Sequence, residues 1–127
     1  MKILGIGVDV IKNKRIQSLI KNKNFIQRTF SENEVKFSKN KHNKINYFAK
    51  RFAAKEAFVK SIGTGFRHGF NFKDISVIND KLGKPSFLIS KKIKNMIKKK
   101  FKIRKFNFFL SITDEEKYSM AFVILQK

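Results

Sequence analysis

Two of the nine carboxylates in the sequence, Asp9 and Glu56, stand inside expected regular elements rather than in turns or helix caps. Asp9 shares one face of an alternating strand with Gly5 and Gly7, which we expect to leave open space beside it. Glu56 lies among alanines in the strongest helix. Two carboxylates that face one cleft suit Mg²⁺, a hard ion that takes oxygen ligands, or form an acid–base pair. The alternatives are a solvated carboxylate at a strand end for Asp9 and an i,i+4 ion pair with Lys60 for Glu56.

A stripe of basic side chains and a short glycine-rich stretch accompany Glu56 along the same helix. Their spacing suggests that phosphate groups are handled near the end of this helix. The alternative is a solvated basic face that ends in a glycine cap. The glycines match neither a P-loop nor a dinucleotide-binding fingerprint, so the phosphate hypothesis depends on the cations. The residues concerned are Arg51, Lys55, Lys60, Gly63 and Gly65.

Hydrophobic periodicity assigns these residues to elements. Residues 45–62 are the strongest helix because they hold four alanines, which are good helix formers, and Gly63 is a typical C-terminal stop. Residues 3–11 alternate as a half-buried strand does. Its apolar face carries Leu4, Ile6, Val8 and Val10.

The rest of the chain alternates short helices and strands. Ser31 and Glu34 fit a capping box that begins a short helix. Further helices are expected within residues 12–23, 25–30 and 90–101, and strands over residues 74–79, 86–89, 106–113 and 118–125. The order predicts one α+β domain over residues 1–127, with a mixed or antiparallel sheet packed on a long central helix.

Charge is the strongest compositional feature. Thirty Lys and Arg against nine Asp and Glu give a formal net charge of +21, which favours anionic partners. Twenty-five of the basic residues are Lys, and codon bias can explain part of this excess because Lys, Asn, Ile and Phe share A/T-rich codons. Residues 91–105 hold nine basic residues and could bind nucleic acid or an anionic membrane surface. A solvated helix face is the simpler interpretation, and we expect neither partner.

Several classes of protein are excluded. The sequence has no Cys, which rules out disulfides, thiolate nucleophiles and Cys-ligated zinc. No apolar run approaches the roughly 20 residues of a membrane span. The first residues lack the apolar core and cleavage site of a signal peptide, so we expect a cytoplasmic protein.

Three motifs in order along the chain resemble those of a known family. Residues 5–10 (GIGVDV) resemble its N-terminal strand, residues 51–65 (RFAAKEAFVKSIGTG) its central signature, and residues 79–85 (NDKLGKP) its third block. The chain is identified by this resemblance as a member of the small bacterial 4′-phosphopantetheinyl transferases, the holo-[acyl-carrier-protein] synthase type. The similarity extends over essentially the whole chain.

The resemblance implies a reaction and a cofactor. The 4′-phosphopantetheine arm of coenzyme A passes to a serine of apo acyl carrier protein, with adenosine 3′,5′-bisphosphate as the second product, in support of fatty acid biosynthesis. Family members hold Mg²⁺ between the diphosphate and two carboxylates, which correspond to Asp9 and Glu56. Lys60 corresponds to a lysine near the phosphates. Glu56 or a metal-bound water would accept the serine proton.

The resemblance also implies partners. The family is commonly a trimer with its sites between subunits, and Lys84 and Pro85, with the preceding glycine, would come from the neighbour. Basic residues after the first strand would recognise the acidic carrier protein. In this sequence, those assigned to the carrier are Lys14, Arg15 and Arg28.

One departure from the family pattern and one rival hypothesis accompany this assignment. Many members have a His before the last turn, whereas this sequence has Asp114 there, so a role for that His in holding coenzyme A does not transfer. The rival is a small basic nucleic-acid-binding (ribosome-associated) protein. It predicts exposed aromatic and basic residues on one face and no use for Asp9 or Glu56.

Overall fold

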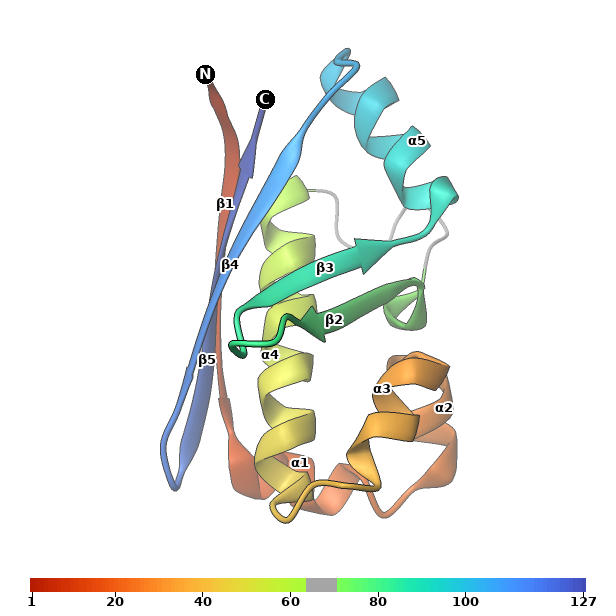
Figure 1. The fold of residues 1–127 in the computed structure, drawn as a ribbon, viewed down its shortest axis with the longest axis vertical. Coiled ribbons are helices and arrows are strands. Elements are labelled where there is room, and N and C mark those ends of the chain that lie inside the picture. The colour runs from red at the N-terminus through yellow and green to blue at the C-terminus, as the bar shows by residue number, and fades with distance from the viewer. Residues whose placement is uncertain (64–70) are drawn as a thin grey trace.

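A three-stranded antiparallel sheet packed on one long helix forms the centre of the molecule. The computed structural model describes residues 1–63 and 71–127. The sheet has the strand order β1-β5-β4, with β1 at Ile3–Lys12, β4 at Asn107–Asp114 and β5 at Tyr118–Gln126. Helix α4 (Lys44–Ile62) runs along one face of this sheet, and the two chain ends lie close together (Figure 1). The predicted α+β class is confirmed.

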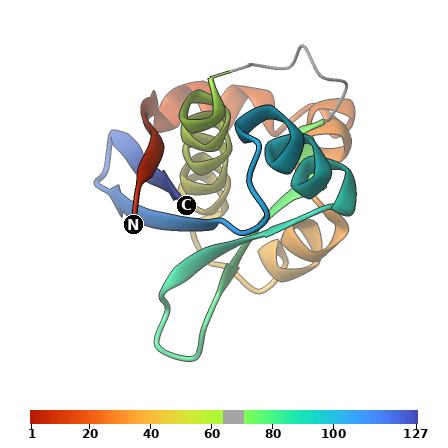
Figure 2. The same ribbon diagram turned by 90° about the horizontal axis from the view of Figure 1, so that it is seen from above.

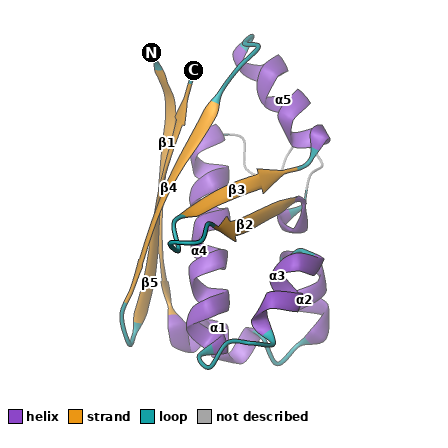
Figure 3. Cartoon of the chain, in the orientation of Figure 1, coloured by secondary structure: helices purple, strands orange, loops and turns teal. Residues whose placement is uncertain are grey.

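Shorter elements surround α4. Helices α1 (Asn13–Leu19), α2 (Lys23–Thr29) and α3 (Glu32–Ser38) follow β1, and α5 (Lys91–Phe101) precedes β4. Strands β2 (Ile75–Asn79) and β3 (Pro85–Ile89) pair as an antiparallel hairpin after the short 3₁₀ helix η1 (Phe72–Asp74). Figure 3 shows α2, α3 and α5 on the side of α4 away from the three-stranded sheet. Each predicted strand is present within a few residues of its expected bounds; η1 was not predicted.

Local sequence signals set the ends of two helices. Ser31 accepts a hydrogen bond from the Glu34 backbone, and the Glu34 carboxylate accepts one from the Ser31 backbone at 2.9 Å, which confirms the capping box. Gly63 ends α4 in the left-handed conformation, with φ of 81°. Gly65, which was expected to follow it in a phosphate-handling stretch, lies outside the described residues. No helix of the described part is long and apolar enough to cross a membrane.

The glycines of β1 face α4 and allow the two elements to touch. A Cβ atom on Gly5 would lie 1.9 Å from the Ser61 carbonyl oxygen, and one on Gly7 would lie 1.8 Å from the Ala57 carbonyl oxygen. The expectation that these glycines leave open space is therefore wrong. The space is filled by the helix backbone, because only a residue without a side chain lets a strand come this close.

The apolar face of β1 is the one that no part of the described chain covers. Ile6, Val8 and Val10 are 59%, 51% and 60% exposed, while Gly7 and Ile11 on the other face are buried. The register extends this exposed face across β5 through the pairs Val8 with Phe122 and Val10 with Met120. A register shift between Ile3 and Gly5 turns Leu4 toward the core instead. The predicted half-buried strand is therefore present, and in the single chain its buried face is the one that carries Gly5 and Gly7.

The close approach of β1 and α4 leads to a stability prediction. Gly7→Ala should lower the free energy of unfolding by about 3 kcal/mol or more, because the new methyl group forces strand and helix apart. The control is Gly83→Ala, where the new Cβ meets nothing within 4 Å and only the positive φ of 88° opposes it. This control should cost about 1–2 kcal/mol. Urea denaturation measures both, and equal losses would contradict the proposed contact.

Candidate active site

Strand β1 and helix α4 bring three of the predicted residues together. The Lys60 ammonium lies 3.1 Å from the Asp9 carboxylate and donates a second hydrogen bond to the Val8 carbonyl at 3.0 Å. The Asp9 side chain is 16% exposed and that of Lys60 is 54% exposed, so the pair borders solvent. Glu56 precedes Lys60 by one helical turn on the same helix.

The pKa of Glu56 is affected by both charges of the Asp9–Lys60 pair. Burial raises the pKa of Glu56 above its ordinary value, and the neighbouring Asp9 carboxylate adds to the increase. The Lys60 ammonium and the Arg15 guanidinium act in the opposite direction. Two carboxylates and two cations from β1, α1 and α4 therefore interact at one place, although they are far apart in the sequence.

The carboxylate oxygens of Asp9 and Glu56 suit a hard divalent cation. Two carboxylates that repel each other are stabilised by a cation between them, and Mg²⁺ commonly takes one or two carboxylates and keeps water and phosphate oxygens for the rest. Within residues 1–63 and 71–127, no group of three or more His, Asp or Glu could hold a metal by itself. Asp9 and Glu56 would supply two oxygen ligands and leave the other positions of such a cation to water or phosphate oxygens.

Arg51 lies on another part of α4, beside a separate cavity. Its guanidinium stacks 3.7 Å from the ring centroid of Tyr47 and donates to the Asn79 side chain at 2.9 Å. Its Nε atom is buried without a hydrogen-bond partner in the described part of the chain. The cavity has a volume of about 610 Å³. Its basic lining comes from Lys41, His42, Lys50, Arg51 and Lys81.

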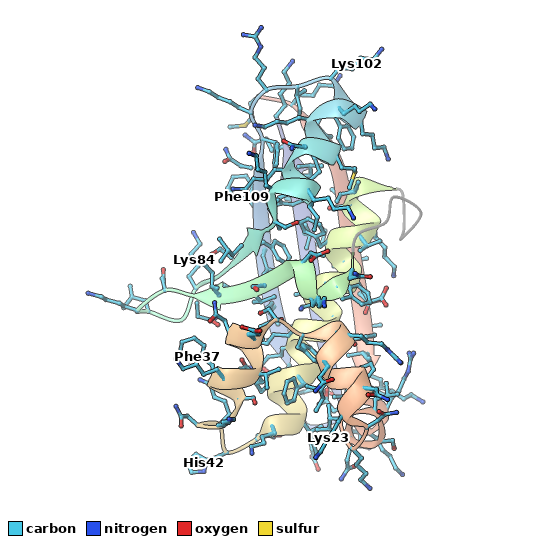
Figure 4. All side chains as sticks on the ribbon, turned by 90° about the vertical axis from the view of Figure 1, so that its right-hand side faces the viewer. Lys23, Phe37, His42, Lys84, Lys102 and Phe109 are labelled. Carbon is cyan, nitrogen blue, oxygen red and sulfur yellow. The ribbon has the colours of Figure 1, made fainter. Side chains whose placement is uncertain are left out.

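The β2–β3 hairpin contributes to the wall of the same cavity. Pro85 and Gly83 line it, whereas Lys84 is exposed on the hairpin, which projects from the body of the molecule (Figures 2 and 4). Asp114, the residue at the departure from the family pattern, also lines it. Its carboxylate accepts a hydrogen bond from Asn46 at 2.8 Å.

The structure places Lys55 in the core rather than at a phosphate site, which corrects the expectation from the sequence. Its side chain is fully buried, and its ammonium forms an ion pair with Glu34. It also donates to the carbonyl oxygens of Thr29 at 2.8 Å and Phe72 at 3.1 Å. Burial lowers the pKa of Lys55 to about 8, while Glu34 acts against this shift. The three N–H groups of the ammonium are thus used to join α2, α3 and η1 to α4.

The residues predicted to bind a partner occupy two helices. Arg15 on α1 is near enough to Glu56 to lower its pKa, so α1 borders the site. Lys14 lines a different pocket, together with Gln17 and Lys117. Arg28 lies over the ring of Phe25, 5.8 Å from its centroid, in the last turn of α2. The structure therefore associates Arg15 with the carboxylates and does not join Arg28 to them.

Two residues that hold Arg51 in place were not predicted as site residues from the sequence. Tyr47 lies one helical turn before Arg51, and Asn79 ends β2. The i,i+4 spacing of an aromatic ring and a guanidinium on one helix is a signal that could have identified Tyr47. Asn79 belongs to the third quoted motif, but its contact with α4 depends on the hairpin and has no local signal.

Comparisons with known proteins show the family to which the chain belongs. The model of the 4′-phosphopantetheinyl transferase superfamily matches residues 5–123. The holo-[acyl-carrier-protein] synthase of Pelagibacter ubique is 65% identical over 127 residues, which cover 100% of this chain and 99% of the relative. That of Zymomonas mobilis is 43% identical over 129 residues, covering 98% of this chain and 96% of the relative.

Solved structures show the same fold. The holo-[acyl-carrier-protein] synthase of Neisseria meningitidis has a TM-score of 0.89 at 38% identity, covering 99% of this chain and 100% of that one. The Bacillus anthracis protein, solved in complex with CoA (3′,5′-ADP), has a TM-score of 0.81 at 33% identity, covering 98% and 97%.

The matched motifs, the fold and the full-length relatives define a class of protein. The chain belongs to the 4′-phosphopantetheinyl transferase superfamily and, within it, to the holo-[acyl-carrier-protein] synthase family. The family and the enzyme class predicted from the sequence are confirmed. The rival hypothesis of a nucleic-acid-binding protein gave no use to Asp9 and Glu56 and does not account for these relationships.

The burial of Lys55 gives a prediction that separates it from the exposed Lys60. Lys55→Met should lower the free energy of unfolding by about 3–5 kcal/mol, because the Glu34 carboxylate remains buried without its partner. Adding Glu34→Gln should recover a large part of this loss, since no unpaired charge remains. The matched control, Lys60→Met on the same helix, should cost less than about 1 kcal/mol. Chemical denaturation measures these free energies of unfolding. Equal losses for Lys55→Met and Lys60→Met would contradict the assignment of Lys55 to a buried ion pair.

Proposed function

We propose that this chain transfers 4′-phosphopantetheine from coenzyme A to a serine of apo acyl carrier protein, with Mg²⁺ bound by Asp9 and Glu56. The observation that carries the proposal is the cluster of Asp9, Glu56 and Lys60 in a chain of this family. The Bacillus anthracis relative in complex with CoA (3′,5′-ADP) supports coenzyme A as the donor. The holo carrier protein so formed would serve fatty acid biosynthesis.

The transfer is a displacement at phosphorus. The carrier serine oxygen forms a bond to the phosphorus that bears the pantetheine arm, and the bond from that phosphorus to adenosine 3′,5′-bisphosphate breaks. Such chemistry depends on positioning and charge neutralisation rather than on a covalent nucleophile of the enzyme. Bound Mg²⁺ would neutralise charge on the diphosphate. Lys60 would contribute a second positive charge there, from its position beside Asp9.

The serine proton must reach a base. Glu56 is the candidate, directly or through a water molecule, because burial and the Asp9 carboxylate raise its pKa and so increase its affinity for a proton. The Lys60 ammonium and the Arg15 guanidinium act against this increase in the pKa of Glu56.

The cavity beside Arg51 would hold phosphate groups of a coenzyme bound between subunits, because Arg51 lies about 180° around α4 from Lys60 of its own chain. Phosphate groups need cations with free donors, and the buried, unpartnered Nε of Arg51 and the basic lining of the cavity offer them. Gly63, at the end of α4, and Gly65 remain proposed contacts of the coenzyme. Lys84 and Pro85 on the projecting hairpin would serve a site shared with a neighbouring subunit.

The carrier protein would dock on the basic helix that borders Glu56. Acyl carrier proteins are acidic, and the Arg15 guanidinium can bind a carboxylate through two parallel hydrogen bonds. Its position beside Glu56 supports Arg15 as the main contact, with Lys14 on the same helix. Arg28 on α2 would act at the edge of this surface. Contacts of this kind mainly set the rate of encounter and the orientation of the partner.

A self-associated state would cover the exposed face of the three-stranded sheet. Contiguous apolar patches of this kind on a folded surface mark an interaction site. The patch consists of Ile6, Val8, Val10, Phe109, Met120 and Phe122. The family resemblance favours a trimer, in which the sites lie between subunits.

The metal-binding carboxylates can be tested by activity. The purified protein is incubated with coenzyme A, Mg²⁺ and apo carrier, and intact mass spectrometry follows formation of the holo carrier. Asp9→Asn and Glu56→Gln should each lower kcat/KM about a hundredfold or more, because the cation loses a ligand. The control Glu32→Gln removes an exposed carboxylate on α3 and should remain within twofold of wild type. Unchanged transfer by either site variant at limiting Mg²⁺, with an intact circular dichroism spectrum, would refute the site.

The oligomer can be tested at the sheet face. Phe122→Lys should convert the assembly to monomers in light scattering, because it places a charge in the middle of the apolar face. The matched control is Phe37→Lys on α3, which is also exposed but lies outside this face and should keep the assembly intact. A wild-type protein that is monomeric and fully active would rule out the shared site.

A further inference from the structure

We propose that Asn13 is a positioning residue, which ties α1 to the turn between β4 and β5 and thereby holds Arg15 in place for the carrier protein. The proposal rests on the transfer reaction and the docking surface proposed above. It assigns a function to a buried polar residue that neither the metal cluster nor the coenzyme cavity uses.

The hydrogen bonds of Asn13 all lead to one hairpin. Its side-chain amide donates to the carbonyl oxygens of Glu115 at 2.9 Å and Glu116 at 3.0 Å. Its side-chain oxygen accepts a hydrogen bond from the Ser119 hydroxyl at 2.7 Å, and its backbone N–H donates to the Lys117 carbonyl at 2.8 Å. Asn13 is 3% exposed and Ser119 is fully buried. Four hydrogen bonds thus join the start of α1 to a segment more than 100 residues later in the chain, and the one between Asn13 and Ser119 is buried.

Helix α1 needs such an external attachment. It has only seven residues, and Lys12 at its N-cap position provides no side-chain cap. Helices this short are not stable by themselves in water. Its fully buried apolar contact is Ile16, while Leu19 and Ile20 are partly buried. Apolar contacts are non-directional, so they can be made over a range of rotations of the helix about its axis. The directional hydrogen bonds at the first turn allow only one of these rotations.

The rotation of α1 decides where Arg15 points. Arg15 follows Asn13 by two residues, and successive residues are about 100° apart around a helix. A change in the rotation of the first turn would therefore move the guanidinium that now acts on Glu56. The long Arg15 side chain can compensate for small shifts of the helix, but fixing it in a less favourable conformation costs conformational entropy.

The same hairpin is also attached to α4, which carries Glu56 and Lys60. The Asn46 amide donates to the Asp114 carboxylate at 2.8 Å and to the Glu115 carbonyl at 3.3 Å. The Glu115 carbonyl oxygen therefore accepts from both Asn13 and Asn46. Lys50, one turn further along α4, lies 3.9 Å from Asp114. The hairpin is thus a brace between the helix of the docking residue and the helix of the proposed catalytic residues.

A double-mutant cycle between Asn13 and Arg15 tests the proposal. Asn13→Leu keeps the side-chain size but removes the side-chain hydrogen bonds. It should raise KM for the apo carrier about fivefold or more and leave KM for coenzyme A and kcat within twofold, since encounter and orientation are affected. Arg15→Glu should raise the carrier KM at least as much. The double variant should resemble Arg15→Glu alone, because residues that act through one another are not additive.

Controls and a milder variant separate positioning from stability. Ser119→Ala removes one hydrogen bond of the brace and should raise the carrier KM in the same direction, so it replaces Asn13→Leu if that variant does not fold. Ser38→Ala removes a buried hydroxyl on α3 and Lys99→Glu changes a charge on α5. Ser38→Ala should leave the carrier KM unchanged, and Lys99→Glu should change it less than Arg15→Glu does.

Specific results would overturn the proposal. Additive effects of Asn13→Leu and Arg15→Glu, or equal increases in both KM values, would show that Asn13 acts on stability alone. A wild-type protein that transfers nothing would refute the proposed function instead. In that case, fluorescence anisotropy of labelled apo carrier still tests Asn13, because docking precedes transfer. A carrier affinity unaffected by Asn13→Leu would refute the positioning role.

Discussion

The backbone contact between β1 and α4 is the constraint on which the site depends. Gly5 and Gly7 permit the carbonyl oxygens of Ser61 and Ala57 to lie where side chains would otherwise be. Asp9 continues the same face of the strand by two residues, and Lys60 lies between those two carbonyls on the helix. The ion pair of Asp9 and Lys60 is therefore a consequence of the glycine contact, because a wider separation would take the carboxylate out of reach.

Two lysines on α4 show how burial separates a structural charge from one that is proposed to act on the substrate. Lys55 and Lys60 each pair with one carboxylate and also donate to backbone carbonyls. The Lys55 pair is removed from water, so breaking it leaves an uncompensated charge and the arrangement is fixed. The Lys60 pair is exposed to solvent and exchanges partners at little cost. Only the second kind of pair can release a cation toward a substrate phosphate.

The local parts of the fold were predictable from the sequence, and the parts that depend on distant contacts were not. The capping box at Ser31 and the stop at Gly63 follow from neighbouring residues, so both were predicted correctly. The alternation in β1 showed two faces but not which of them meets α4, because the glycine face is buried through backbone contact rather than through apolar side chains. Lys55 was misassigned for a similar reason, since its carboxylate partner belongs to α3. Asn13 gave no signal, because its partners lie on the last hairpin.

The hypothesis that Asp9 and Glu56 bind a metal had a firmer basis in the sequence than the assignment of Lys55. Both carboxylates stand in regular elements, where neither a turn nor a helix cap accounts for their presence. The fold brings them within electrostatic reach of each other. The sequence could not show that Arg51 would be held apart from them by Tyr47 and Asn79.

Among the described residues, two regions expose several apolar side chains each, and both would be covered in the proposed assembly. The outer face of the three-stranded sheet is one of them. The β2–β3 hairpin is the other, where Leu82 is 96% and Leu88 is 52% exposed. One side of this hairpin already serves its own chain, since Pro85 lines the cavity beside Arg51. Leu82 and Lys84 at its tip do not line that cavity. Burying Leu82 against a neighbouring copy would remove apolar area from water and bring Lys84 to the proposed shared site. In the proposed assembly, such a hairpin would link coenzyme binding to the contact between subunits.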